Sequence, residues 1–306
     1  MSLAEPNYIL QFEIRYPVPA ELLVFILEKG CKHFFSPVSS AIKGIAKFDS
    51  NFQLKDLFFF FVKSAKVLLD LAASCHGLVR LAVHGTQEIS QKGFTKLLKC
   101  IIQSSETLEV LTINHRKLKY EELKLIVTLC VNLTDLNIRG TRISQKSVNF
   151  LCRNITTKLR KLDISWQPMF GDDQLEVLVT RCELSELCIT ETSVSNNSVS
   201  LIVQKMPRCL AKFEAENNTF SFSNLLKIAS LQKLKVLCVW NLPTNAKEEI
   251  LKKVPHLSFS NRKKECEKPS DTKCLLCDHL NIASPYQSCV LNVFGWEIKD
   301  KLRQYL

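Results

Sequence analysis

Cysteine and histidine residues near the C-terminus have the spacing most suggestive of chemistry in this sequence. Cys274 and Cys277 form a C-x-x-C pair, with Cys266, His279 and Cys289 close by. Zinc takes four thiolate or imidazole ligands in a tetrahedron, and such a site can order a segment that has little apolar periodicity. The spacing to the outer residues is irregular for zinc. We therefore predict no metal here and ordinary thiols in a packed tail, with Cys274 and Cys277 as the pair to test.

Catalytic arrangements are not evident elsewhere. His76, His84 and His115 lack the nucleophile and orienting partners of a hydrolase site, and the 8 glycines form neither a phosphate-binding loop nor a nucleophile elbow. We expect a non-catalytic binding protein that uses no cofactor.

The composition indicates a globular protein with reduced thiols. The 306 residues are 46% hydrophobic, which is enough to fill a core. The 13 cysteines are odd in number, and the segment Met1–Gln11 lacks the basic and apolar regions of a signal peptide. We therefore expect the chain in the cytoplasm, the nucleus or both.

The net charge of +11 is spread along the chain, and only Arg262-Lys263-Lys264 forms a tight basic cluster. Nucleic-acid binding would call for aromatic residues interleaved with these charges, which the strand-like segments lack, so we do not expect a nucleic-acid partner. The apolar run Leu57–Val62 is interrupted by Lys55 and Lys63 well short of a membrane span. We interpret it as a buried helix and expect no membrane contact.

Seven segments of one leucine pattern organise the middle of the chain. Each resembles Leu133-Thr-Asp-Leu136-Asn-Ile138, and the distances between successive first leucines are 30, 25, 26, 25, 26 and 24 residues. The first leucines are Leu78, Leu108, Leu133, Leu159, Leu184, Leu210 and Leu234. A fixed period in this range is the signature of a repeat architecture.

The apolar residues inside each unit alternate first as in a strand and then as in a helix. In the third unit Leu136 and Ile138 form the strand part, Ile143 the turn, and Val148 and Leu151 the helix. The same roles fall in the fifth unit to Leu187, Ile189, Val194, Val199 and Ile202. No unit can bury its apolar face alone, so neighbours must stack. We predict an α/β leucine-rich-repeat solenoid, a curved horseshoe with parallel strands on its concave face and helices on its convex face.

Cysteines recur one to three residues before four of the leading leucines, at Cys75, Cys130, Cys182 and Cys209. A cysteine at this place and a period near 26 are typical of one subclass of leucine-rich repeats. There the thiol behaves as a small buried hydrophobe.

These units resemble the leucine-rich repeats of F-box proteins, the substrate receptors of Skp–cullin–F-box ubiquitin ligases. The resemblance covers roughly residues 75–306 and is carried by Asn132–Asn137, Lys161–Trp166, Leu234–Trp240 with Val254–Leu257, and Phe294–Lys299. It implies substrate recognition for a ubiquitin ligase, with a protein partner that can be phosphorylated and a Skp-type adaptor. It also implies that the tail, residues 260–306, folds back along the concave face. The alternative is a ligase-independent adaptor or regulator.

The F-box itself would lie in an irregular, mostly helical cap formed by residues 1–74. Pro19, Glu21, Leu22, Leu23 and Ile26 match the first half of the family pattern and would dock the adaptor. The second half should bring a tryptophan, yet none occurs before Trp166. The other interpretation is a degenerate repeat, with Ile9–Ile14 as its strand and Pro19–Leu27 as its outer helix.

Residues between the inward leucines of each strand project from the concave face and form the candidate binding surface. They are Arg80, His84, Asn114, Asp135, Arg139, Lys161, Asp163, Trp166, Glu186, Glu214 and Trp240. Since neighbouring strands lie about 5 Å apart, these residues form ladders about 30 Å long, basic at first and acidic later. Arg80, Arg139, Arg160 and Lys161 could bind a phosphorylated residue, and a solvated surface is the alternative.

Trp166 and Trp240 stand at predicted strand ends. Tryptophan is enriched among residues that dominate interfaces, and a ring stacked under the tail is the other interpretation.

Overall fold

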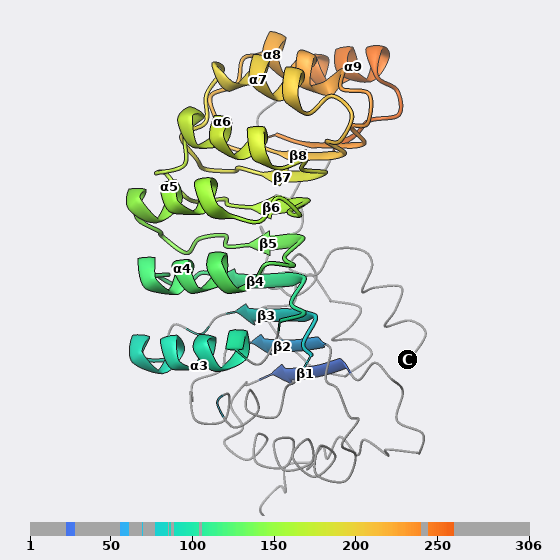
Figure 1. The fold of residues 1–306 in the computed structure, drawn as a ribbon. Coiled ribbons are helices and arrows are strands. Elements are labelled where there is room, and N and C mark those ends of the chain that lie inside the picture. Colours follow the sequence, from blue (N-terminus) through green and yellow to red (C-terminus); the bar gives the residue numbers. More distant parts are fainter. Residues whose placement is uncertain are drawn as a thin grey trace, which may run out of the picture.

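The computed structural model describes residues 23–27, 56–60, 69, 77–84, 86, 89–103, 106–239 and 244–259. Within these residues ten strands form one sheet in which every neighbouring pair is parallel and the order in space is the order in the chain (Figure 1). The strands are β1 (Leu23–Leu27), β2 (Asp56–Phe60), β3 (Arg80–His84), β4 (Val110–Asn114), β5 (Asp135–Asn137), β6 (Lys161–Asp163), β7 (Glu186–Cys188), β8 (Lys212–Glu214), β9 (Val236–Cys238) and β10 (Ser258–Phe259).

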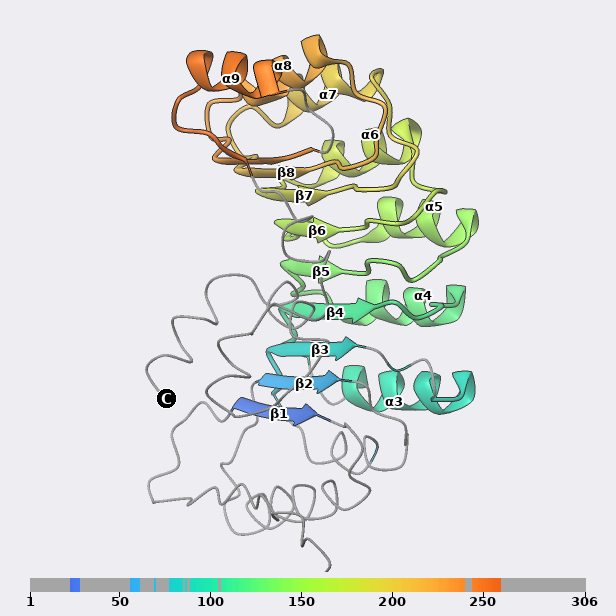
Figure 2. The same ribbon diagram turned by 180° about the vertical axis from the view of Figure 1, so that it is seen from behind.

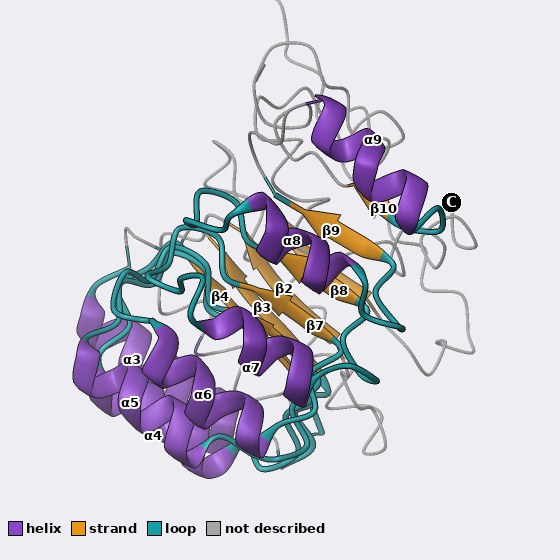
Figure 3. Ribbon diagram, turned by 90° about the horizontal axis from the view of Figure 1, so that it is seen from above, coloured by secondary structure: helices purple, strands orange, loops and turns teal. Residues whose placement is uncertain are grey.

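The helices that follow the strands all cover the same side of this sheet, as opposite views show (Figures 1 and 2). They are α3 (Gln91–Gln103), α4 (Tyr120–Leu129), α5 (Gln145–Asn154), α6 (Asp172–Arg181), α7 (Ser198–Lys205), α8 (Phe222–Ala229) and α9 (Thr244–Lys253). Seen along the stack, the strands form an inner layer and the helices an outer one (Figure 3). In the described part of the chain, no helix has the length and apolar character needed to cross a bilayer.

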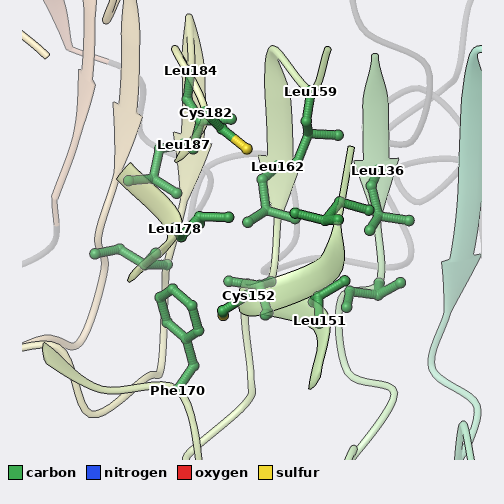
Figure 4. Packing of buried hydrophobic residues seen from close by; sticks show 14 of the residues in the cluster. Leu136, Leu151, Cys152, Leu159, Leu162, Phe170, Leu178, Cys182, Leu184 and Leu187 are labelled. Atoms are coloured by element: carbon green, nitrogen blue, oxygen red, sulfur yellow. The ribbon is translucent and has the colours of Figure 1, made fainter. Parts of the chain in front are cut away.

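The leading leucines lie beside one another because the strands pair in register. Leu136 of β5 pairs with Leu162 of β6, which in turn pairs with Leu187 of β7. All three are buried and pack with Leu151 of α5 and Leu178 of α6 in one continuous core (Figure 4). The fold is therefore a leucine-rich-repeat solenoid, as the period predicts, because each unit completes the core of the next.

Apolar positions within the units also lie where the pattern predicts. In the third unit Leu136, Ile138, Ile143, Val148 and Leu151 are all buried. In the fifth unit the buried residues are Leu187, Ile189, Val194, Val199 and Ile202.

Two predicted helices are wrong. The structure places Leu23–Leu27 in β1 and Asp56–Phe60 in β2, where Leu57 is the register partner of Leu81 in β3. Short apolar runs do not distinguish a buried helix from a buried strand, and β-branched and aromatic residues favour the strand. The sheet thus continues into the segment for which we predicted a mostly helical cap. The boundaries after residues 74 and 259 stay predictions.

Junction cysteines behave largely as small core residues. Cys130 and Cys182 are buried, whereas Cys209 is only partly buried, and Cys75 lies outside the described residues. Burial raises the pKa of the Cys130 thiol to about 12.

A row of polar side chains runs through the turns that follow the strands, one per repeat. Its members are Arg116, Thr141, Gln167, Thr192 and Asn218, and the long ones each reach back to the preceding repeat. The Gln167 amide donates to the Ile138 carbonyl (3.1 Å) and accepts from the Ile143 amide (3.0 Å). Asn218 donates to the Thr192 hydroxyl in the same way (3.0 Å). These bonds satisfy backbone groups of the turns that make no hydrogen bond within the sheet.

Candidate functional site

The inner face of the sheet, opposite the helices, carries a row of charges at the first residue of each strand from β5 to β8. In four neighbouring strands the register pairs Asp135 with Lys161, Lys161 with Glu186, and Glu186 with Lys212. We call these four residues the charge row. The charges alternate along the sheet and do not separate into a basic and an acidic half. The predicted separation is wrong because it left Lys212 out.

Ion pairs bind this surface together. Lys161 Nζ lies 2.9 Å from Glu186 Oε1, and Lys212 Nζ lies 2.9 Å from Glu214 Oε1. Burial alone would lower the pKa of Lys212, but the adjacent Glu214 carboxylate outweighs it and raises that pKa above its ordinary value. Both lysines of the charge row are therefore already matched by carboxylates.

The four basic residues predicted to bind phosphate do not converge. Arg80 lies on β3, two strands from Arg139, which means about 10 Å along the sheet. Arg139 lies 4.0 Å from Asp163 Oδ2, and Lys161 is held by Glu186. Arg160 is exposed and donates to two carbonyls of its own loop. This arrangement does not form an anion site.

The acidic residues farther along the sheet are deeply buried. Glu214 and Glu216 are both 2% exposed, and the Cys238 thiol donates to Glu216 Oε1 at 2.9 Å. Among the described residues, no group of three or more histidine, cysteine or carboxylate side chains is arranged to hold a metal.

The structure describes only some of the other predicted site residues. Asn114 is buried at the end of β4, and His84 is the last residue of β3. Outside the described residues lie Pro19, Glu21, Leu22, Trp240, Cys274 and Cys277. Leu23 and Ile26 belong to β1, so the helical form of the docking motif is wrong for these two residues.

A second row, not predicted from the sequence, lies in the turns just after the strands. Its members share a left-handed backbone with φ between 54° and 66°, and they are His115, Gly140, Trp166, Glu191 and Asn217. We call it the turn row. Each is the fourth residue after the second apolar residue of the repeat pattern, for example Leu136 before Gly140, and backbone bonds link neighbouring turns, such as His115 N to the Arg139 carbonyl (3.0 Å). Aligning the repeats at this position would have revealed Gly140 between two large ring-bearing residues.

Gly140 allows its neighbours in the turn row to touch. The rings of His115 and Trp166 meet edge to face with centroids 5.2 Å apart, although a whole repeat separates them. The Arg139 guanidinium lies 4.8 Å from the centre of the Trp166 ring. Burial, followed by the positive charge of Arg139, lowers the pKa of His115 despite the opposing effect of Asp163. The His115 ring and the Arg139 guanidinium therefore both support Trp166.

Trp166 nevertheless remains open to solvent. Its exposed fraction is 44%, and nearby Met169 is 46% exposed. Pro168, between them in the chain, is also exposed. An apolar surface held in place by a cation and a ring is suited to contact with another protein.

The sequence matches no known family model and no curated protein. Among solved structures, a chain from the crystal structure of the Rad7 and Elc1 complex in yeast is similar at 13% identity, with a TM-score of 0.49. The similarity covers 74% of this chain and 72% of that one. The assignment of the fold rests on the sheet and helices described above.

Proposed function

We propose that this chain is a non-catalytic scaffold that binds another protein on the inner face of its sheet and on the adjacent turn row. The observation that carries the proposal is the exposed Trp166, which is held by His115 and Arg139 at the edge of a continuous parallel sheet. Stacked repeats offer a long surface on which several side chains can act together.

A finer proposal is substrate recognition for a Skp–cullin–F-box ubiquitin ligase. It is supported by the sequence resemblance of the repeats and tail, in particular to the S-phase kinase-associated F-box protein. The second candidate is an adaptor or regulator that works without the ligase. The β1 strand favours this candidate, because Leu23 and Ile26 would have to lie on a helix to dock a Skp-type adaptor in the expected way.

Capture of partners from cells tests the scaffold proposal. The full-length chain would be compared with a variant carrying Lys161→Ala and Glu186→Ala on the inner face. A control carrying Lys124→Ala and Glu121→Ala changes the same residue types on the exposed side of α4. We expect the inner-face variant to lose proteins that the control retains, as measured by quantitative mass spectrometry. Equal sets of captured proteins would contradict the proposal.

Binding to a purified Skp-type adaptor separates the two finer candidates. The ligase receptor predicts a complex with the full-length chain that is lost on combined Leu22→Ala and Leu23→Ala substitution, with thermal unfolding used to verify the fold. The ligase-independent adaptor predicts no complex with either protein.

A further inference from the structure

Trp166 occupies a backbone conformation that does not suit it. Its φ is 63°, in the left-handed region where a Cβ clashes with the backbone and where glycine and asparagine are preferred. Two other members of the turn row, Gly140 and Asn217, follow that preference. A bulky ring that is both strained and exposed is a recognised mark of a functional position.

Side-chain groups without hydrogen-bond partners lie in three residues that immediately precede members of the turn row. Within the described part of the chain, Asn114 Oδ1, Arg139 Nη1 and Ser165 Oγ are buried atoms that make no hydrogen bond. Asn114 is 2% exposed and Ser165 is fully buried. Buried polar groups are nearly always satisfied, so three together require an explanation.

The three groups occupy the same level on neighbouring strands. Backbone bonds join His115, next to Asn114, to Arg139, and join Gly140, next to Arg139, to Ser165. These three residues therefore span about 10 Å across the sheet, and the last of them, Ser165, immediately precedes Trp166 in the chain. Together they offer one acceptor, the Asn114 side-chain amide oxygen, and two donors, the Arg139 guanidinium and the Ser165 hydroxyl.

A peptide group is the ligand chemistry that matches this set. It supplies an acceptor and a donor on the same unit, whereas a phosphate supplies acceptors only. The local charge favours the same choice, because Asp163, 4.0 Å from Arg139, already balances the guanidinium and would repel an anion. The exposed faces of Trp166 and Met169 add an apolar contact.

We propose that Trp166 and Arg139 form the centre of a recognition site for an extended, uncharged segment of a partner protein. A proline or aromatic side chain of the segment lies on the Trp166 ring. One of its peptide groups bonds to Arg139, which exposes 16% of its side chain, and neighbouring peptide groups bond to Ser165 and Asn114 as the guanidinium shifts. This inference rests on the proposed scaffold function and specifies the chemistry of its partner.

Two pairs of variants isolate the site from the fold. Trp166→Gly removes the ring and relieves the left-handed strain, so the variant should fold at least as readily as the wild type. Its control is Arg142→Gly, at an exposed residue outside the turn row that also has left-handed backbone, with φ 49°. Arg139→Gln removes the donor charge, and Arg160→Gln, on an exposed loop arginine, is its control.

Selection from a phage-displayed library of random dodecapeptides on the full-length chain tests the proposal. We expect enriched peptides that share a proline or aromatic anchor without acidic residues. Their dissociation constants should rise about tenfold or more in Trp166→Gly and in Arg139→Gln, and stay unchanged in both controls. Acidic consensus peptides, affinity that is independent of Trp166, or failure to enrich any peptide would each overturn the inference.

Failure of this site and failure of the scaffold function give different results. Peptides that bind equally well to Trp166→Gly but are lost from the Lys161→Ala and Glu186→Ala variant would end the peptide-site inference and leave the scaffold proposal intact. The scaffold proposal itself fails only if the inner-face variant captures the same cellular proteins as its control.

Discussion

His115 and Trp166 touch across an intervening repeat, with ring centroids 5.2 Å apart at an interplanar angle of 65°. Gly140 lies between them and leaves the space that the contact fills. The contact links three successive turns, so a side chain added at Gly140 should displace both rings.

Gly140→Ala should destabilise the fold by about 1–2 kcal/mol, because alanine is strained at φ +66° and the new Cβ would lie 2.8 Å from His115 Nδ1. Urea unfolding followed by circular dichroism measures this. Gly171→Ala is the matched control, since Gly171 has extended backbone and its nearest neighbouring atom would be 3.5 Å away. We expect the control to change stability by about 0.5 kcal/mol or less. Equal losses in the two variants would contradict the role of Gly140.

Gln167→Ala should cost about 1–3 kcal/mol of unfolding free energy. The substitution leaves the buried Ile143 amide without its acceptor, whereas the Ile138 carbonyl keeps its hydrogen bonds from the Thr141 hydroxyl and amide. The exposed Gln145→Ala in α5 is the control and should shift stability by about 0.5 kcal/mol or less. A loss below about 1 kcal/mol at Gln167 would show that the polar row contributes little.

Cys130 and Cys152 should resist alkylation while the protein is folded. Burial raises the pKa of each thiol to about 12, so at pH 8 only about one thiol in ten thousand is in the reactive thiolate form. Iodoacetamide labelling with peptide mass spectrometry should modify both residues only after denaturation. Partly exposed Cys100 serves as the internal reference. Native labelling of Cys130 or Cys152 as fast as that of Cys100 would refute the prediction.

Asp172 should contribute stability that disappears in acid. Burial raises the pKa of its carboxyl, but hydrogen bonds from Ser195 and Ser198 outweigh that effect and hold the pKa below its ordinary value of 3.8. A lowered pKa stabilises the fold above the unfolded value, and the stabilisation is lost as the pH falls through the folded value.

Asp172→Asn should therefore unfold at lower urea than the wild type at pH 7, and the difference should shrink as the pH falls below about 4. Asp173→Asn makes the same charge change at the neighbouring exposed position of α6. A constant difference across this pH range would exclude the carboxylate as its source.

Local periodicity was enough to predict the repeats because the core positions of each unit lie close together in the chain. Leu136 and Ile138 point into the core in a pattern that any single unit reveals. The same reasoning failed for Leu23–Leu27 and Asp56–Phe60, which carry continuous apolar runs with neither a helical nor an alternating period. Only the pairing of these strands with the rest of the sheet decides between the two conformations.

The candidate site was predicted only in part, because its decisive contacts cross between units. Trp166 was recognisable from the sequence as a tryptophan at a strand end. Its contact with His115, however, depends on Gly140 in the repeat between them, which has no side chain to block it. Likewise, the position of Lys161 on the inner face was predictable, whereas its pairing with Glu186 depends on the register of two strands. Contacts of this kind become visible only when repeats are compared position by position.

The charge row also affects the order in which the repeats stack during folding. The leucine cores of successive repeats are nearly interchangeable, so a folding chain could stack a unit on the wrong neighbour without losing much apolar burial. Skipping one repeat would set Asp135 against Glu186, or Lys161 against Lys212, and like charges directly opposite each other destabilise a sheet. The alternation that holds the finished surface together therefore also penalises misassembled stacks and helps each strand to select its proper neighbour.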